Sequence, residues 1–294
     1  MDERRTVTTA DGWTLGVHVL SAEGARRGVA LLLHAMMVDG RTFLMAGDSG
    51  LAGTLAAVGW EVWIADFRGH ARSGPTPAEG GTWTYEDLVM RDVPALVAAA
   101  REAGRGPVVI LGHSLGGHVS AATLAAGLTE VDALVLLAAN IWRPSLEPSR
   151  GLRLAKGLAI RGFAATARAF GRYPTRRLGQ GPAEEAAPYC ADLARFWTSD
   201  AWNPRDGSVD WSAGLPRVQA SVLQLHATGD GLLGAEASAR AWARPLPNLT
   251  SWRVGQGHSG VAGDPTHVGL VTSSACVPAH RLVADWLSGA VPKR

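Results

Sequence analysis

The sequence predicts an α/β protein with a doubly wound, mostly parallel sheet of about eight strands and an inserted helical cap. Two observations support this fold class: short apolar runs alternate with helical segments along most of the chain, and one long interval interrupts that rhythm. The chain has 294 residues, of which 47% are hydrophobic, which is enough for one large core with an insertion.

Seven apolar stretches predict the strands. The first is a hairpin at 7–20, because alternating apolar positions flank Asp11-Gly12, a dipeptide typical of tight turns. The others are short, and most of them are largely apolar, as expected for parallel strands that are buried on both faces. They lie at 28–33, 60–65, 107–111, 131–138, 221–226 and 250–254.

Helical patterns separate these strands. Thr84 is a suitable N-cap for a helix over 84–103, because Glu86 and Asp87 then place acidic groups in its first turn. Further helices are predicted at 51–58, directly after the glycine-rich turn at 112–117, and at 277–287. This alternation favours helices on both faces of a parallel sheet.

The interval between the strands at 131–138 and 221–226 is too long for a simple crossover. It contains helical patterns at 152–170 and 183–197 together with several prolines. We therefore expect a core of residues 1–139, a helical cap of residues 140–218, and the rest of the core at 219–294.

The predicted cap has an unusual charge distribution. Residues 150–177 include eight basic side chains and no acidic one. Such a run typically forms a solvated surface. The alternative is a basic lid that favours an anionic substrate or weak contact with a membrane surface.

The bulk composition limits the other partners that we expect. The chain has 28 basic and 26 acidic residues, a net charge of +2, so no global field favours a nucleic-acid partner. Cys190 and Cys276 have neither metal-ligand spacing nor the number needed for a disulfide framework. The charged N-terminal residues are unlike a signal peptide, and no apolar run reaches the roughly 18 residues of a membrane span. We therefore expect a cytoplasmic protein without metal or cofactor, and the oligomeric state stays open.

The chemistry is predicted around Gly112-His113-Ser114-Leu115-Gly116, which follows a buried strand and precedes a helix of small residues. A Gly-x-Ser-x-Gly motif in that context predicts a nucleophile elbow, in which a strained turn exposes the serine hydroxyl. The glycines are required because a side chain would collide with the neighbouring strand or helix. Ser114 is thus the candidate nucleophile.

A serine nucleophile needs a base and an acid that orients the base, and in this topology both follow late strands. Asp230 follows the strand at 221–226 and is the candidate acid. Two histidines compete for the base: His267, which is closer in sequence to the final helix, and His258, which is closer to the last strand. We favour His267 because the base loop usually leads directly into that helix, and keep His258 as the alternative base.

The developing oxyanion needs two backbone N–H donors. One is expected from Leu115, the residue after the nucleophile, and the other from Met36, in the loop after the strand at 28–33. His34 is expected to brace that loop, and Asp66 and Arg68 to brace the loop beside the elbow.

On these residues the chain resembles the α/β-hydrolase superfamily. Besides the elbow and Asp230, the stretch Asp66-Phe67-Arg68-Gly69-His70-Ala71-Arg72-Ser73-Gly74 is similar to the family's D-x-R-G-x-G-x-S segment. Within the superfamily it looks like the bacterial predicted α/β-hydrolase group near serine aminopeptidases and monoglyceride-lipase-like enzymes. His34-Ala35 replaces the usual His-Gly of the oxyanion loop, and Ala227 stands where glycine is common. The resemblance implies acyl transfer through a serine ester.

Three functions are compatible with these features. The first is a serine hydrolase of a small-molecule carboxylic ester, thioester or lipid-like acyl compound, acting through a Ser-His-Asp triad. The second is an acyltransferase that uses the same triad, with another acceptor in place of water. The third is a non-catalytic, ligand-binding member of the fold.

Overall fold

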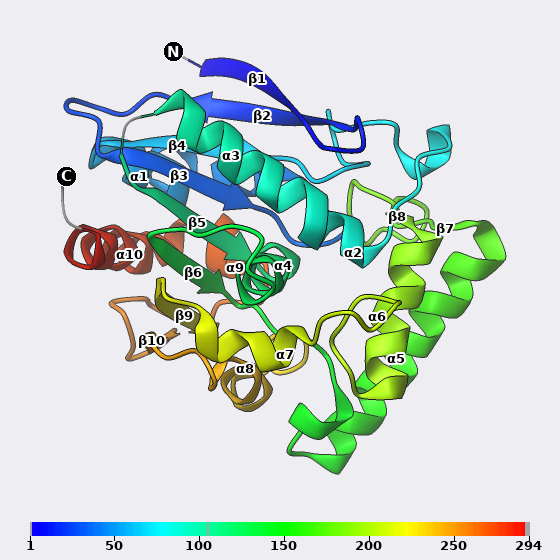
Figure 1. Cartoon of the computed structure of the whole chain (residues 1–294). Helices are drawn as coiled ribbons and strands as arrows, with labels where there is room; N and C mark the ends of the chain where they lie inside the picture. Colours follow the sequence, from blue (N-terminus) through cyan, green and yellow to red (C-terminus); the bar gives the residue numbers. More distant parts are fainter. Residues whose placement is uncertain (1, 105, 292–294) are drawn as a thin grey trace.

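The computed structural model describes residues 2–104 and 106–291. Its centre is one eight-stranded sheet, in the order β1-β2-β4-β3-β5-β6-β9-β10 (Figure 1). β1 and β2 form the antiparallel hairpin, β2 pairs antiparallel with β4, and the remaining pairs are parallel. The strands are β1 (Asp2–Thr8), β2 (Thr14–Leu20), β3 (Gly28–Leu33), β4 (Trp60–Ala65), β5 (Val108–His113), β6 (Ala133–Leu137), β9 (Ser221–Ala227) and β10 (Leu249–Val254). The predicted fold class is confirmed.

The first strand is longer than predicted. Alternation placed its start at Val7, whereas β1 begins at Asp2. Residues 3–6 are polar or charged because β1 is an edge strand, where polar side chains face solvent and discourage pairing with other molecules. An apolar pattern therefore does not mark them.

Helices cover both faces of the sheet. One core cluster packs α3 (Val93–Ala103), α4 (Leu115–Ala125) and α8 (Glu236–Ala243) against one face. The other packs α1 (Leu51–Ala57), α9 (Gly269–Thr272) and α10 (Val277–Ala290) against the opposite face. No helix in the described part of the chain has both the length and the apolar character to cross a bilayer.

The predicted helix over 84–103 is interrupted. Thr84 caps α2 (Tyr85–Asp87) as expected, but a π-helical turn at Leu88–Asp92 precedes α3. Pro94 has no N–H to donate to the carbonyl four residues earlier, so the regular ladder breaks at this point.

The segment between β6 and β9 leaves the sheet. It contains α5 (Arg150–Phe170), α6 (Ala187–Ser199), α7 (Trp211–Gly214) and the short pair β7 (Arg172–Tyr173) and β8 (Glu185–Ala186). α5 and α6 lie side by side, on the side of the molecule where α2 lies (Figure 1). The helix predicted from 183 begins at Ala187, because Glu185 and Ala186 pair with β7. Pro188 lies in the first turn of the helix, where its missing N–H costs no hydrogen bond.

Candidate active site

Ser114 occupies a strained turn between β5 and α4. Its φ of 51° and ψ of −109° lie outside the regions that side-chain-bearing residues usually adopt. Hydrogen bonds on both sides hold the turn: the Ser114 N–H donates to the Leu137 carbonyl over 2.9 Å, and the Gly116 N–H donates to the His34 carbonyl over 3.1 Å. The elbow is thus fastened to both strands that flank β5.

The two motif glycines allow this close approach. A Cβ atom on Gly116 would lie 2.2 Å from the Leu33 carbonyl oxygen, and one on Gly112 would lie 2.3 Å from the Gly117 nitrogen. Both distances are far inside van der Waals contact with backbone atoms, which cannot rotate away. The collision expected from the motif is therefore present at both positions.

Asp230 and His267 come together near the elbow. The Asp230 carboxylate accepts a hydrogen bond from His267 Nδ1 at 2.5 Å, and both side chains are almost fully buried. Burial alone would raise the pKa of Asp230, but the His267 hydrogen bond and the Gly234 and Leu233 backbone N–H groups outweigh it and lower the pKa. Asp230 is therefore a carboxylate at neutral pH, which places the His267 proton on Nδ1 and leaves Nε2 as the basic nitrogen.

His113 links this pair to Ser114. Its Nε2–H donates to the His267 carbonyl over 3.0 Å, and the two imidazole rings are 5.0 Å apart. Burial, with a further contribution from His267, lowers the pKa of His113 to about 3. A neutral His113, adjacent to the nucleophile in sequence, thus holds the backbone of the His267 loop.

His258, the alternative base, is located elsewhere. It is exposed in a turn after β10, where its N–H donates to the Gly255 carbonyl. The hydrogen bond to Asp230 is made by His267. The structure therefore brings Asp230 together with His267 and leaves His258 on the surface.

The two expected oxyanion donors belong to the segments that follow β5 and β3. Leu115 is the first residue of α4, and Met36 follows His34 and Ala35 in the loop after β3. Among the described residues, neither the Leu115 nor the Met36 N–H donates a hydrogen bond to the protein. His34 braces the loop: its Nδ1–H donates to the Ala35 carbonyl and its Nε2 accepts from the Phe67 N–H.

A glutamate from the inserted segment forms a hydrogen bond with the loop after β3, and sequence analysis did not predict this contact. Glu185 Oε1 accepts from the Met37 N–H over 2.6 Å and lies 3.2 Å from His70 Nε2. The other ring nitrogen, His70 Nδ1, faces the Arg68 carbonyl. Burial would lower the pKa of His70, but the Glu185 charge and hydrogen bond raise it instead. Glu185 thus connects the segment to the oxyanion loop through the Met37 N–H and to the loop after β4 through His70.

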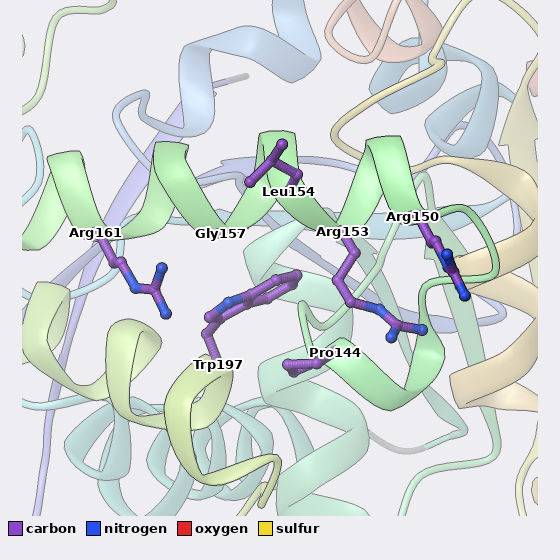
Figure 2. A pocket seen from close by; sticks show the side chains of 7 residues that line it. All are labelled: Pro144, Arg150, Arg153, Leu154, Gly157, Arg161 and Trp197. Carbon is purple, nitrogen blue, oxygen red and sulfur yellow. The ribbon is translucent and has the colours of Figure 1, made fainter.

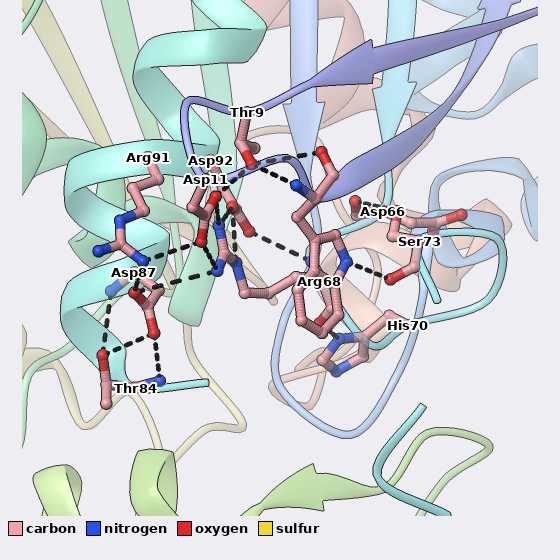
Figure 3. A network of polar contacts seen from close by, with 11 residues as sticks. Thr9, Asp11, Asp66, Arg68, His70, Ser73, Thr84, Asp87, Arg91 and Asp92 are labelled. Atoms are coloured by element: carbon pink, nitrogen blue, oxygen red, sulfur yellow. Dashed lines mark hydrogen bonds and ion pairs between the residues drawn. The ribbon is translucent and has the colours of Figure 1, made fainter. Parts of the chain in front are cut away.

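Arg68 holds the neighbouring loop in the way that sequence analysis expected (Figure 3). Its guanidinium contacts Asp92 at 2.6 Å and Asp11 at 2.9 Å, and Arg91 also contacts Asp11. The Asp66 carboxylate accepts from the Gly40 N–H over 2.8 Å. These bonds fix the loop through the hairpin turn and the helix that follows it.

His118 lies one turn after Ser114 on α4. Trp202 Nε1–H donates to the Tyr85 hydroxyl oxygen, so the hydroxyl proton is available for His118 Nδ1, at 2.8 Å. The His118 ring proton is then on Nε2. Burial lowers the pKa of His118 to about 3, with a contribution from His267. The sequence analysis did not single out His118; its spacing of four residues from Ser114 on a predicted helix is the signal that could have indicated it.

Across residues 2–104 and 106–291, no group of three or more His, Cys, Asp or Glu side chains is arranged to hold a metal ion.

A family model described as serine aminopeptidase S33 matches residues 36–245, well over half of the chain. Triacylglycerol lipase 2 of Arabidopsis thaliana is 30% identical over 129 residues, which are 39% of this chain and 31% of that lipase. A 2-hydroxy-6-oxononadienedioate/2-hydroxy-6-oxononatrienedioate hydrolase of Dechloromonas aromatica is 26% identical over 206 residues, 66% of this chain and 69% of that protein. The chain spans about a third of the length of the lipases that it matches.

Solved structures with the same fold cover nearly the whole chain. An esterase from Exiguobacterium antarcticum superimposes with a TM-score of 0.66 at 14% identity, over 97% of this chain and 100% of that one. A thermophilic esterase from Thermogutta terrifontis gives a TM-score of 0.64 at 16% identity, over 99% and 100%. At these identities the likeness concerns the fold.

Proposed function

Because this chain belongs to the serine aminopeptidase S33 family of the α/β-hydrolase superfamily, we propose that it is a serine hydrolase of a carboxylic ester, thioester or lipid-like acyl compound. The observation that supports this most directly is the buried Asp230–His267 pair, fastened through His113 to the strained turn that carries Ser114. The lipases and esterases among its relatives are in line with that chemistry.

The proposed reaction assigns one role to each group. Ser114 Oγ attacks the substrate carbonyl while His267 Nε2 takes its proton, and Asp230 stabilises the imidazolium that forms. The backbone N–H groups of Met36 and Leu115 donate to the oxyanion. His267 then returns the proton to the leaving group, and water, activated by the same imidazole, releases the acyl group from Ser114.

Residues 140–218 are proposed to act as a cap over this site. The support is the contact of Glu185 with the Met37 N–H, in the loop that offers the oxyanion donor. A cap that excludes water would favour the second candidate, acyl transfer to another acceptor. Comparing hydrolysis with transfer to added alcohols, amines or thiols separates the two reactions.

Covalent labelling tests the nucleophile. A fluorophosphonate probe is expected to label the wild type and the Ser274→Ala control, in which an exposed serine is removed, but not Ser114→Ala. Folding of each variant is checked by thermal unfolding. A folded wild type that stays unlabelled, or a Ser114→Ala variant that is labelled as well as the wild type, contradicts the proposal.

Two histidine variants test the base. Hydrolysis of p-nitrophenyl esters of graded chain length is expected to fall by roughly 10⁴-fold or more in His267→Ala, as when a triad member is removed. His258→Ala should keep its rate because the His258 side chain is exposed and the histidine that is bonded to Asp230 is His267. The opposite pattern would reassign the base to His258.

A further inference from the structure

The outward face of α5 is apolar where a surface helix is normally polar. Among the described residues, three of the four most exposed large apolar side chains belong to this helix: Leu154 at 64%, Leu158 at 62% and Phe170 at 56%. Leu154 and Leu158 are one turn apart, and apart from arginines the other exposed positions on their side of the helix are small. These are Gly151, Ala155, Gly162, Ala165 and Ala169.

Arginines border this apolar face. Arg150, Arg161 and Arg168 are exposed, and their spacings of 11 and 7 residues place them along one edge of the helix. Within the described residues, the one ion pair that α5 makes is that of Lys156 with Glu147, on the buried side. Along this edge, the arginines therefore form no ion pair with the acidic side chains that the structure describes.

A hollow lies along the same edge. Its volume is about 330 Å³, and Arg150, Arg153 and Arg161 of α5 surround it together with Trp197 of α6 and Pro144 (Figure 2). Gly157 allows the indole to approach, because a Cβ at that position would lie 3.1 Å from Trp197 Nε1. Cationic groups around an apolar floor suit an anionic group that is attached to an apolar body.

We propose that the outward face of α5 binds the surface of a membrane containing anionic phospholipid. Leu154 and Leu158 enter the boundary between headgroups and acyl chains, the arginine edge contacts phosphates, and the hollow beside Trp197 receives one headgroup. A second copy of the chain fits this face less well, because a two-fold interface along α5 would bring two uncompensated arginine edges close together.

Vesicle binding tests this surface. The probes are vesicles of phosphatidylcholine alone and vesicles that also contain phosphatidylglycerol, and the measured quantity is the partition coefficient by co-sedimentation. The wild type and Ser114→Ala are both expected to prefer the anionic vesicles, and added salt should weaken the binding. Binding requires no turnover, so this result stands or falls independently of the proposed hydrolase activity.

Matched variants separate the two contributions. Each arginine near an anionic surface adds roughly five-fold to partitioning, so the triple variant R150Q/R161Q/R168Q should bind about 100-fold more weakly. The control R101Q/R244Q/R281Q removes the same charge from exposed positions on other parts of the molecule and should change partitioning much less. L154S/L158S should lower partitioning roughly ten-fold or more, whereas Leu282→Ser on α10 should not.

Several results would overturn the proposal. If the wild-type protein binds neither kind of vesicle, or binds both equally, anionic lipid is not its partner. If the partition coefficient falls equally in the arginine triple variant and in its control, net charge alone is responsible and the α5 edge is not a specific site. A dimeric wild type that becomes monomeric in L154S/L158S would assign this face to a second copy of the chain.

Discussion

Replacing Asp230 by asparagine distinguishes two roles of its carboxylate. Oδ2 accepts from His267 Nδ1 at 2.5 Å and from the Gly234 N–H at 2.8 Å. An asparagine that placed its NH₂ group there would face two donors, so its carbonyl oxygen is expected to keep the Oδ2 position. The His267 proton then stays on Nδ1, and the variant loses the negative charge but not the tautomer.

The magnitude follows from that geometry. A hydrogen bond to a charged partner contributes about 1.5–3 kcal/mol, and much of this would be lost at the stage where His267 becomes an imidazolium. The value of kcat/KM for Asp230→Asn should therefore fall by roughly 10- to 150-fold. Asp230→Ala removes both the charge and the orientation, so its loss should approach roughly 10⁴-fold.

The assay is hydrolysis of a p-nitrophenyl ester at neutral pH, with Asp206→Asn as a control that makes the same chemical change at an exposed site. If Asp230→Asn and Asp230→Ala lose equal activity, the argument that Gly234 fixes the tautomer is wrong. If both retain wild-type activity, Asp230 is not the triad acid.

Three further predictions concern the supports of the site. Gly116→Ala should destabilise the fold by about 1–3 kcal/mol or more, because the new Cβ would lie 2.2 Å from a β3 carbonyl oxygen. An unchanged melting temperature would show that the backbone accommodates this Cβ and would contradict the prediction. Lys156→Met should lower the free energy of unfolding by about 3–5 kcal/mol, because it leaves the buried Glu147 carboxylate without its partner. Adding Glu147→Gln to this variant should restore much of the lost stability. If the single and the double variant are equally unstable, the ion pair does not explain the loss. Glu185→Gln should destabilise the protein more near pH 6 than near pH 9. Because folding raises the pKa of His70, its ion pair with Glu185 contributes fully to stability below the ordinary histidine pKa of 6.5. That contribution is lost as the pH rises through the pKa of His70 in the folded protein. Denaturant unfolding at both pH values measures the difference.

Most of the sheet could be predicted because its strands carry their own pattern. The runs at 28–33 and 60–65 are apolar apart from Glu61 and match β3 and β4 at both ends, since parallel strands in the centre of a sheet are buried on both faces. The edge strand β1 lacks that burial and its first five residues were missed. Local pattern thus predicts the elements that lie inside the core better than those at its border.

The elbow could also be predicted from sequence, because close backbone contacts around Ser114 require the glycines of its motif. The contact between Glu185 and Met37 could not, since it joins residues that are 148 positions apart and neither has a local signature. The ion pair of Arg68 with Asp92 is similar: each residue has a plausible local role, and only the fold brings them together. Contacts between residues far apart in sequence, within the core and between the core and the inserted segment, are therefore what the structure adds.

The buried histidines around Ser114 follow one physical rule. His34, His113 and His118 each have a pKa of about 3 because they are buried, so all three rings are neutral at physiological pH. Their hydrogen-bond partners fix the position of each proton, and in the proposed mechanism these weakly basic rings do not compete with His267 for the serine proton. A charge that develops near Ser114 would then be met by the Asp230–His267 pair and by backbone dipoles rather than by these three rings.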